Sequence, residues 1–219
     1  MESLQQSILI SPDFSRLGYL FLKGYDVDNL SQDHQLNLAK QAVFLMEKLG
    51  GEHMFHPPAE KILKFMQAGH TAIITDHSLR QLWGFIKLDP WFKPSANIPG
   101  EGIGNITIDD VTRAGLYFPV GVEVGSLVVV PQHQNKGFGK FLAKEASSLS
   151  EEIYPGIPRI AVVTNDNLSS LHVFTKIGWI GVSPEEAKYI MQGVDVLEGW
   201  TPPSTIFVDP LSFPGLHNY

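Results

Sequence analysis

The chain has 219 residues, of which 43% are hydrophobic and 18% charged, and its formal net charge is −7. A chain of this length and composition is expected to form a single domain around a sizeable core. The acidic balance gives no electrostatic help toward a nucleic-acid partner. Because the sequence contains no cysteine, it excludes disulfides, thiolate nucleophiles and zinc–thiolate sites.

Neither a membrane nor a metal is indicated as a partner. The first residues lack the basic start and apolar stretch of a signal peptide, and no apolar run approaches the ~20 residues of a membrane-spanning helix. His53 and His56 lie three residues apart in a glycine- and proline-flanked stretch. A metal site would need further ligands nearby, so we interpret them as loop histidines. We expect a cytoplasmic protein without a metal ion.

Two helices are predicted in the first third of the chain. Ser31 is a suitable N-cap for the first helix, whose apolar periodicity spans residues 36–49 and which Gly50 would end. Pro58 would open the second helix and Gly69 would close it.

A β-hairpin is predicted next, from residues 71–75 and 82–88, because both runs are rich in β-branched and apolar residues. Residues 89–121 then separate this hairpin from the next strand, where a short turn would suffice. Loops of this length are usually functional or disordered. The aromatic residues Trp91 and Phe92 make disorder less plausible, which leaves a lid over a binding site or a surface decoration.

The centre of the chain combines a strand, a turn and a helix. Residues 122–130 are dominated by β-branched and apolar residues, and Pro131 ends the strand because proline cannot donate a ladder hydrogen bond. A helical pattern follows, with apolar residues at Phe138, Phe141, Leu142, Ala146 and Leu149.

The turn between them has the features of a pyrophosphate site. The first N–H groups of a helix lack internal partners and face the positive end of its dipole, which suits a phosphate. Gly137 and Gly139 would let a ligand approach the backbone, while Lys136 and Lys140 add positive charge. The spacing matches neither the Rossmann fingerprint nor the P-loop.

These residues resemble the coenzyme A loop of the GNAT N-acetyltransferase superfamily, [QR]-x-x-G-x-[GA], which is matched here by Gln134, Asn135, Lys136, Gly137, Phe138 and Gly139. A later family motif, N-x-x-[AS]-x-x-x-Y-x-[KR]-x-G-[FW], follows a strand-like run at residues 159–164. It is matched in register by Asn167, Ser170, Lys176, Gly178 and Trp179, with Phe174 in place of the tyrosine. The resemblance covers residues 70–182.

The resemblance implies an α/β fold with a mixed, mostly antiparallel sheet of six to seven strands flanked by helices. Residues 1–219 would then form one acyltransferase domain, with a long insertion at 89–121 and a C-terminal extension at 183–219. In that extension, residues 184–192 are predicted to form an inserted helix and residues 205–208 the last strand.

The resemblance also implies a chemistry, which is acetyl transfer from acetyl-CoA as co-substrate to a small-molecule or peptide amine by direct attack. The turn of Gln134 to Lys140 would hold the pyrophosphate, and Asn167 would lie near the cofactor arm. A bulge in the fourth strand would free N–H groups for the carbonyl oxygen at Leu127, Val128 and Val129. The negative net charge mildly favours a cationic acceptor.

The expected catalytic residues are Glu123 and Ser170. An acceptor amine with a pKa of ~10.4 needs a base, and Glu123 lies at the register where some relatives carry one. The alternative is an ordinary glutamate at a sheet edge. Alternation of period two would place Gly125 and Leu127 on its face.

Phe174 departs from the motif, because the family's tyrosine is usually assigned as the general acid and phenylalanine cannot donate a proton. Either the thiolate leaves unassisted, or Ser170, one helical turn earlier, replaces the tyrosine; His172 should point elsewhere. The substitution also leaves open a different function, a non-catalytic acyl-CoA-binding or regulatory module. Acceptor identity, acyl-chain length and oligomeric state, for which a homodimer is one candidate, do not follow from the sequence.

Overall fold

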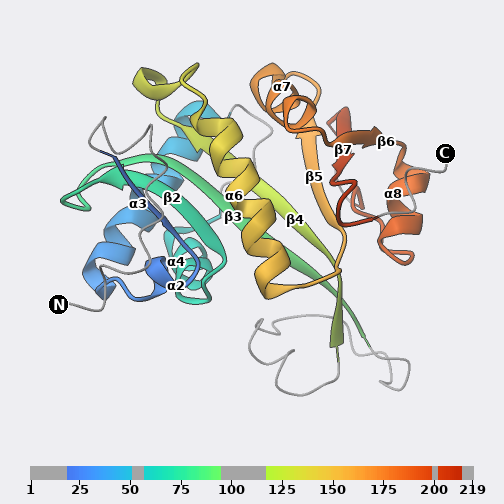
Figure 1. The fold of residues 1–219 in the computed structure, drawn as a ribbon, viewed down its shortest axis with the longest axis horizontal. Helices are drawn as coiled ribbons and strands as arrows, with labels where there is room; N and C mark the ends of the chain where they lie inside the picture. Colours follow the sequence, from blue (N-terminus) through green and yellow to red (C-terminus); the bar gives the residue numbers. More distant parts are fainter. Residues whose placement is uncertain (1–18, 51–56, 95–116, 199–201, 214–219) are drawn as a thin grey trace.

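The structure is a computed structural model that describes residues 19–50, 57–94, 117–198 and 202–213 (Figure 1). Within these residues the chain forms a seven-stranded sheet with the strand order β1-β2-β3-β4-β5-β7-β6. The strands are β1 Tyr19–Lys23, β2 Thr71–Asp76, β3 Leu82–Pro94, β4 Tyr117–Val129, β5 Arg159–Thr164, β6 Ile180–Val182 and β7 Ser204–Val208. All neighbouring strands are antiparallel except β4 and β5, which run parallel. The predicted fold class is confirmed.

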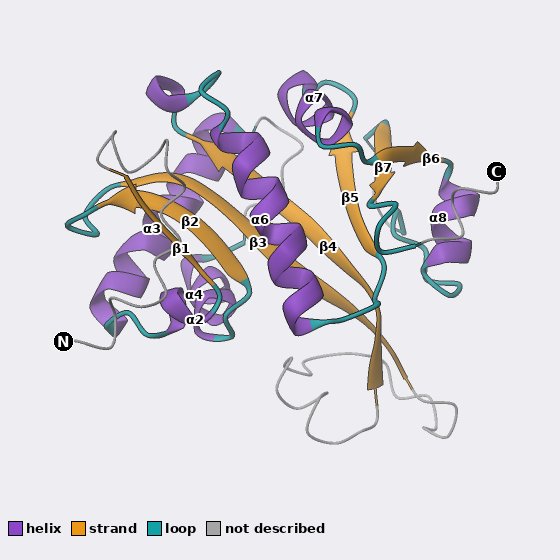
Figure 2. Cartoon of the chain, in the orientation of Figure 1, coloured by secondary structure: helices purple, strands orange, loops and turns teal. Residues whose placement is uncertain are grey.

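Helices cover both faces of this sheet (Figure 2). They are α2 Tyr25–Asp28, α3 Gln32–Leu49, α4 Ala59–Gln67, the 3₁₀ turn η2 Pro131–His133, α6 Phe138–Ile153, α7 Leu168–Lys176 and α8 Pro184–Ile190. The predicted helix start at Ser31 is confirmed, because its hydroxyl accepts a hydrogen bond from the His34 N–H. No helix among the described residues combines the length and apolarity that crossing a membrane requires.

Apolar clusters pack against both faces of the sheet, and a third cluster joins α8 to β5 and β7. On one face, α3 and α4 bury residues such as Leu38, Met46 and Ile62 against Ile73 and Phe85 of the sheet. On the other face, α6 and α7 pack against alternate residues of the same strands, which include Ile74, Ile86, Leu88, Val122 and Val124. The core that a side chain of a central strand joins therefore shows on which face of the sheet it lies.

The hairpin of β3 and β4 is longer than the sequence predicts. Strand β3 continues to Pro94 and β4 begins at Tyr117, so both ends of the expected insertion at residues 89–121 are paired strand. The two strands extend beyond the rest of the sheet (Figure 1). Residues 95–116, which formed most of the expected lid, lie outside the described residues.

A β-bulge interrupts the pairing of β3 with β4. Phe85 pairs with Val128 and Lys87 with Gly125, so Ser126 and Leu127 together oppose a single residue of β3. Ser126 has a φ of +55°, which is unfavourable for a residue with a side chain. Because of the extra residue, the side chains of β4 after the bulge point to the opposite face from the one that simple alternation would give. As a result, Leu127 joins the α6 core, as Val122 does before the bulge.

The expectation that Leu127 shares a face with Glu123 is therefore wrong. Glu123 pairs with Asp89 and points to the face covered by α4, whereas Leu127 packs on the opposite face. The predicted bulge exists but begins one residue earlier than expected, at Ser126, and it includes Leu127.

A buried ion-pair cluster fixes the start of β5. Arg159 is 4% exposed, and its Nε donates to Asp209 Oδ2 at 2.9 Å, while its guanidinium also contacts Glu151. The Arg159 backbone N–H donates to Ser212 Oγ at 2.9 Å. Residues after β7 thus hold β5 where it meets Val122 of β4.

Replacing Arg159 with methionine should leave the carboxylate of Asp209 buried without its cation. We expect Arg159→Met to lower the free energy of unfolding by about 3–5 kcal/mol, the range for breaking a buried ion pair from one side. Arg80→Met, at an exposed arginine, is the control. Urea unfolding compares the two variants, and equal stabilities would show that the cluster does not stabilise the start of β5.

Candidate active site

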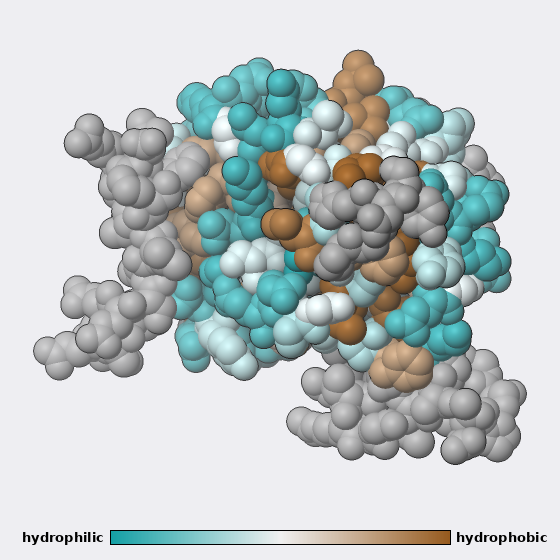
Figure 3. Space-filling view, turned by 45° about the vertical axis from the view of Figure 1, so that its right-hand side comes forward, coloured by the Kyte–Doolittle hydropathy of each residue, from teal (hydrophilic) through white to brown (hydrophobic). Residues whose placement is uncertain are grey.

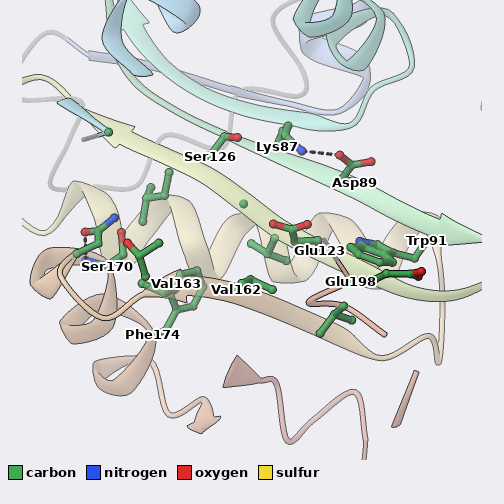
Figure 4. A pocket seen from close by; sticks show the side chains of 17 residues that line it. Lys87, Asp89, Trp91, Glu123, Ser126, Val162, Val163, Ser170, Phe174 and Glu198 are labelled. Carbon is green, nitrogen blue, oxygen red and sulfur yellow. Dashed lines mark hydrogen bonds and ion pairs between the residues drawn. The ribbon is translucent and has the colours of Figure 1, made fainter. Parts of the chain in front are cut away.

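The candidate site lies where β4 and β5 separate. These strands pair at only two positions, Val122 with Arg159 and Glu123 with Ile160. Beyond Glu123 the strands diverge, and a cavity of about 320 Å³ lies between residues 124–127 of β4 and 162–164 of β5 (Figure 4). In the space-filling view, apolar side chains gather on the central part of the surface between more hydrophilic flanks (Figure 3).

Residues from both faces of the sheet line this cavity. Gly50 at the end of α3, together with Lys87, Asp89 and Glu123, belongs to the α3 and α4 side. Leu127, Ser170 and Phe174 belong to the side of α6 and α7. Two molecules could therefore meet in the opening, one from each face of the sheet.

Glu123 occupies the last paired position before the strands diverge. Its carboxylate lies over Gly125, where an added Cβ would be only 2.9 Å from Oε1. Glycine at position 125 therefore leaves the space that this side chain occupies. Figure 4 shows Glu123 among Lys87, Asp89 and Trp91, all three of which come from β3.

Burial raises the pKa of Glu123 above its ordinary value, because removing a carboxylate from water disfavours its charged form. The positive charge of Lys87 opposes this effect, the negative charge of Asp89 adds to it, and the Trp91 indole opposes it more weakly. A carboxylate whose pKa is raised is a stronger base and is better suited to accept a proton from an amine.

The segment after α8 adds a third carboxylate to the cavity, beside those of Asp89 and Glu123. Helix α8 begins with a capping box between Ser183 and Glu186, and the predicted inserted helix is confirmed. Val196, in the segment that follows, packs with α8 against β5 and β7, and Glu198 lines the cavity. In Figure 4 the ring of Trp91 lies between Glu123 and Glu198.

The glycine-containing turn lies at the end of β4, outside the residues that line the cavity. The Gln134 side chain donates to the Val129 carbonyl at 2.9 Å. Asn135 has a φ of +59° and Gly137 a φ of +86°, and no side chain of the described residues caps the first N–H groups of α6. A Cβ at Gly137 would meet no described atom within 4 Å, so the described part of the chain leaves space beside this turn.

The remaining predicted residues have different structural roles. The Val128 side chain is buried in the α3 core and that of Val129 packs toward α6, so only their backbone could face a ligand in the opening. Lys136 and Lys140 are exposed beside the turn, and Phe138 is buried beneath it. Figure 1 places this turn immediately before the start of α6.

Helix α7 brings three of the predicted residues to the cavity. Asn167 Oδ1 accepts the Ser170 N–H at 3.1 Å, so this asparagine is the N-cap of α7. Ser170 and Phe174 line the cavity from one face of the helix, whereas His172 is exposed, as expected. The Phe174 ring is 2% exposed and packs on Trp179 and Phe207, with ring centroids 4.9 and 5.8 Å away, so it is also part of the core.

Sequence reasoning missed the charged residues Lys87, Asp89 and Glu198 of the cavity, and it considered Trp91 only as part of a possible lid. A signal for Lys87, Asp89 and Trp91 is present in the sequence. They recur at every second position of β3, between apolar residues, and alternation of this kind places side chains on one face of a strand. Glu198 has no such signal.

The comparisons with known proteins concern the family and the fold. Residues 113–188 match the model of the FR47-like protein family. No curated protein matches the chain significantly in sequence.

Several solved structures share the fold. The structure of yncA from Salmonella typhimurium with its cofactor acetyl-CoA is 14% identical, with a TM-score of 0.53 over 88% of this chain and 93% of that chain. An acetyltransferase of the GNAT family from Streptococcus pneumoniae is 13% identical, with a TM-score of 0.51 over 87% and 96%. Diaminobutyrate acetyltransferase EctA from Paenibacillus lautus, in complex with L-2,4-diaminobutyric acid and coenzyme A, is 11% identical, with a TM-score of 0.52 over 87% and 93%.

Proposed function

We propose that this chain, which has the fold of the GNAT acetyltransferases, is an acetyl-CoA-dependent N-acyltransferase that acts on a cationic small-molecule or peptide amine. The observation that carries this proposal is the cavity between the diverging strands β4 and β5, with Glu123 at the point where they separate. In this arrangement a thioester and an amine would meet beside Glu123 as the base.

The turn of Gln134 to Lys140 is the proposed site of the coenzyme A pyrophosphate. The uncapped N–H groups at the start of α6 and the positive end of its dipole suit a phosphate, and the space at Gly137 is open. From there the thioester arm would extend along β4 to the opening, between Leu127 and Phe174. The acetyl-CoA bound to yncA and the coenzyme A bound to EctA support this choice of co-substrate.

In the proposed reaction, Glu123 accepts a proton from the acceptor ammonium. The free amine nitrogen attacks the thioester carbonyl, and backbone N–H groups at the bulge around Leu127 stabilise the oxyanion. The C–N bond forms and the C–S bond breaks, and the departing coenzyme A thiolate takes up the second proton that the nitrogen loses as the amide forms. A thiol pKa of ~8.5 makes unassisted departure tolerable at the position where Phe174 replaces a proton donor. Ser170, which lines the same side, is the alternative donor.

The charges of the cavity favour a cationic acceptor. Among the described residues that line it, Asp89, Glu123 and Glu198 are acidic and Lys87 is basic. The Lys87 ammonium already pairs with Asp89 at 2.6 Å. Glu123 could therefore receive the reacting ammonium, while Glu198 could bind a second positive charge beyond the Trp91 ring. EctA, whose substrate is a diamino acid, supports an amine acceptor.

The proposed pyrophosphate site can be tested by adding charge without changing shape. Gly137→Asp should weaken coenzyme A binding at least tenfold, because its carboxylate would repel the phosphates. Gly137→Asn is the matched control, since both side chains tolerate a positive φ. Calorimetric titration measures both affinities, and equal affinities for the two variants would place the pyrophosphate elsewhere.

The proposed base can be tested with acetyl-CoA and a panel of amines. The rate of the wild type should fall as the pH drops through the raised pKa of Glu123, because the protonated carboxyl cannot accept a proton. Glu123→Gln should lower kcat at pH 7 by about 10²-fold and lose this acid limb. Glu60→Gln, at an exposed glutamate of α4, should behave as wild type.

If Glu123→Gln matches the wild type at every pH, Glu123 is not the base. If coenzyme A binds tightly but no amine gives turnover, the second candidate function replaces the first. That function is an acyl-CoA-binding module, and it is favoured by Phe174 in place of the tyrosine.

If Glu198 binds a second positive charge of the acceptor, its substitution should change the KM for the acceptor selectively. Glu198→Gln should raise the KM for an aliphatic diamine by up to about fivefold, the size expected for an exposed ion pair, and change the KM for a monoamine less. The KM for acetyl-CoA should not change. Glu185→Gln, an exposed glutamate of α8, is the control. An equal rise in KM for acetyl-CoA and the diamine would contradict a role in acceptor binding.

A further inference from the structure

Two carboxylates face each other across the strands at the candidate active site. Asp89 of β3 and Glu123 of β4 are direct cross-strand partners, and both side chains line the cavity. Like charges in such a pair destabilise the sheet, and two carboxylates that share a site tend to retain a proton. A base must instead lose its proton before each reaction.

Lys87 lies beside both carboxylates. It precedes Asp89 by two residues on the same face of β3, and it pairs with Gly125, the residue over which the Glu123 carboxylate lies. Its Nζ is 2.6 Å from Asp89 Oδ2 and 4.8 Å from the centroid of the Phe65 ring. Lys87 is only 5% exposed. The ammonium is therefore held in place by an acid on β3 and an aromatic ring on α4.

We propose that Lys87 is a positioning residue whose fixed positive charge keeps the Glu123 carboxylate ionised next to Asp89. The inference rests on the proposed function, in which Glu123 is the base. Asp89 has a separate role, because its carboxylate holds the Lys87 ammonium next to Glu123. The two residues together let one partly buried carboxylate act as a base beside another.

The other groups near Glu123 do not replace Lys87. The indole of Trp91 and the charge of Lys61 on α4 favour the ionised carboxylate less than Lys87 does, and Asp89 opposes it. Glu198 lines the same cavity and adds a further negative charge. Among the described residues that line the cavity, Lys87 is the single basic side chain.

The ionisation of Glu123 can be measured without turnover. The Trp91 indole N–H, assigned with Trp91→Phe in protein labelled with ¹⁵N-tryptophan, should report the titration of the neighbouring carboxyl group. Glu123→Gln should abolish this titration and so identify the group. In Lys87→Met the midpoint should rise by about one pH unit or more, since an opposite charge has been removed. Lys87→Arg, which keeps the charge, should stay near the wild type.

A second substitution separates charge from packing. In Lys87→Met/Asp89→Asn the opposing carboxylate is also gone, so the midpoint should return toward the wild-type value. Lys93→Met, at an exposed lysine further along β3, is the matched control and should not move the midpoint. In the active enzyme, the acid limb of kcat/KM should shift with the midpoint in every variant. A purely structural role of Lys87 would lower activity at all pH values without this shift.

An unchanged midpoint in folded Lys87→Met protein would overturn the inference. If that variant does not fold, Lys87→Gln decides, because it removes the positive charge but keeps a polar end beside Asp89; the midpoint should again rise, and an unchanged midpoint overturns the inference. If the midpoints move as stated but no amine is acetylated, the charge relation stands and the proposed function fails.

Discussion

The structure depends on one interruption, the loss of pairing between β4 and β5 after Glu123. A sheet normally satisfies the backbone N–H and C=O groups of its inner strands, and strands that diverge leave these groups without ladder partners. The divergence is held from two sides. The cluster of Arg159, Asp209 and Ser212 fixes β5 where it begins, and the bulge at Ser126 redirects β4 beyond the last pair. Between these fixed points the sheet has an opening at its centre, and the cavity occupies it.

The opening also divides the site into two environments. The side of α6 and α7 offers apolar and hydroxyl-bearing groups, whereas the side of α3 and α4 offers charged groups. The bulge makes this division possible, because it turns Leu127 toward one core while Glu123 keeps facing the other. A thioester arm and a cationic amine differ in polarity in the same way. The proposed function follows from this match and from the buried lysine that balances the acidic side.

Much of the fold could be predicted from the sequence, because its signals are local. The N-cap at Ser31, the helix start at Pro184 and the β-branched, apolar run of β2 depend on neighbouring residues alone. The bulge position could not be predicted, since it depends on the register between β3 and β4, which no local pattern specifies. The length of their hairpin was missed because Pro90 and Pro94 indicate a loop by sequence, although β3 contains both.

The candidate site was predicted less completely than the fold. Glu123, Leu127, Asn167, Ser170 and Phe174 carried signals from motif register, and they do line one cavity. Lys87 and Glu198 reach that cavity from segments far apart in the chain, so only the folded structure brings them to Glu123. The role of Phe174 is also broader than its motif position indicates, because Trp179 and Phe207 hold its ring in the core.

The most direct test of the account is a crystal structure of the protein with coenzyme A. The account predicts the pyrophosphate on the N–H groups at Gly137 to Gly139 and the thiol sulfur in the opening, between Leu127 and Phe174 and within reach of an amine at Glu123. Coenzyme A bound with its sulfur outside this opening, or with its pyrophosphate away from the start of α6, would contradict it.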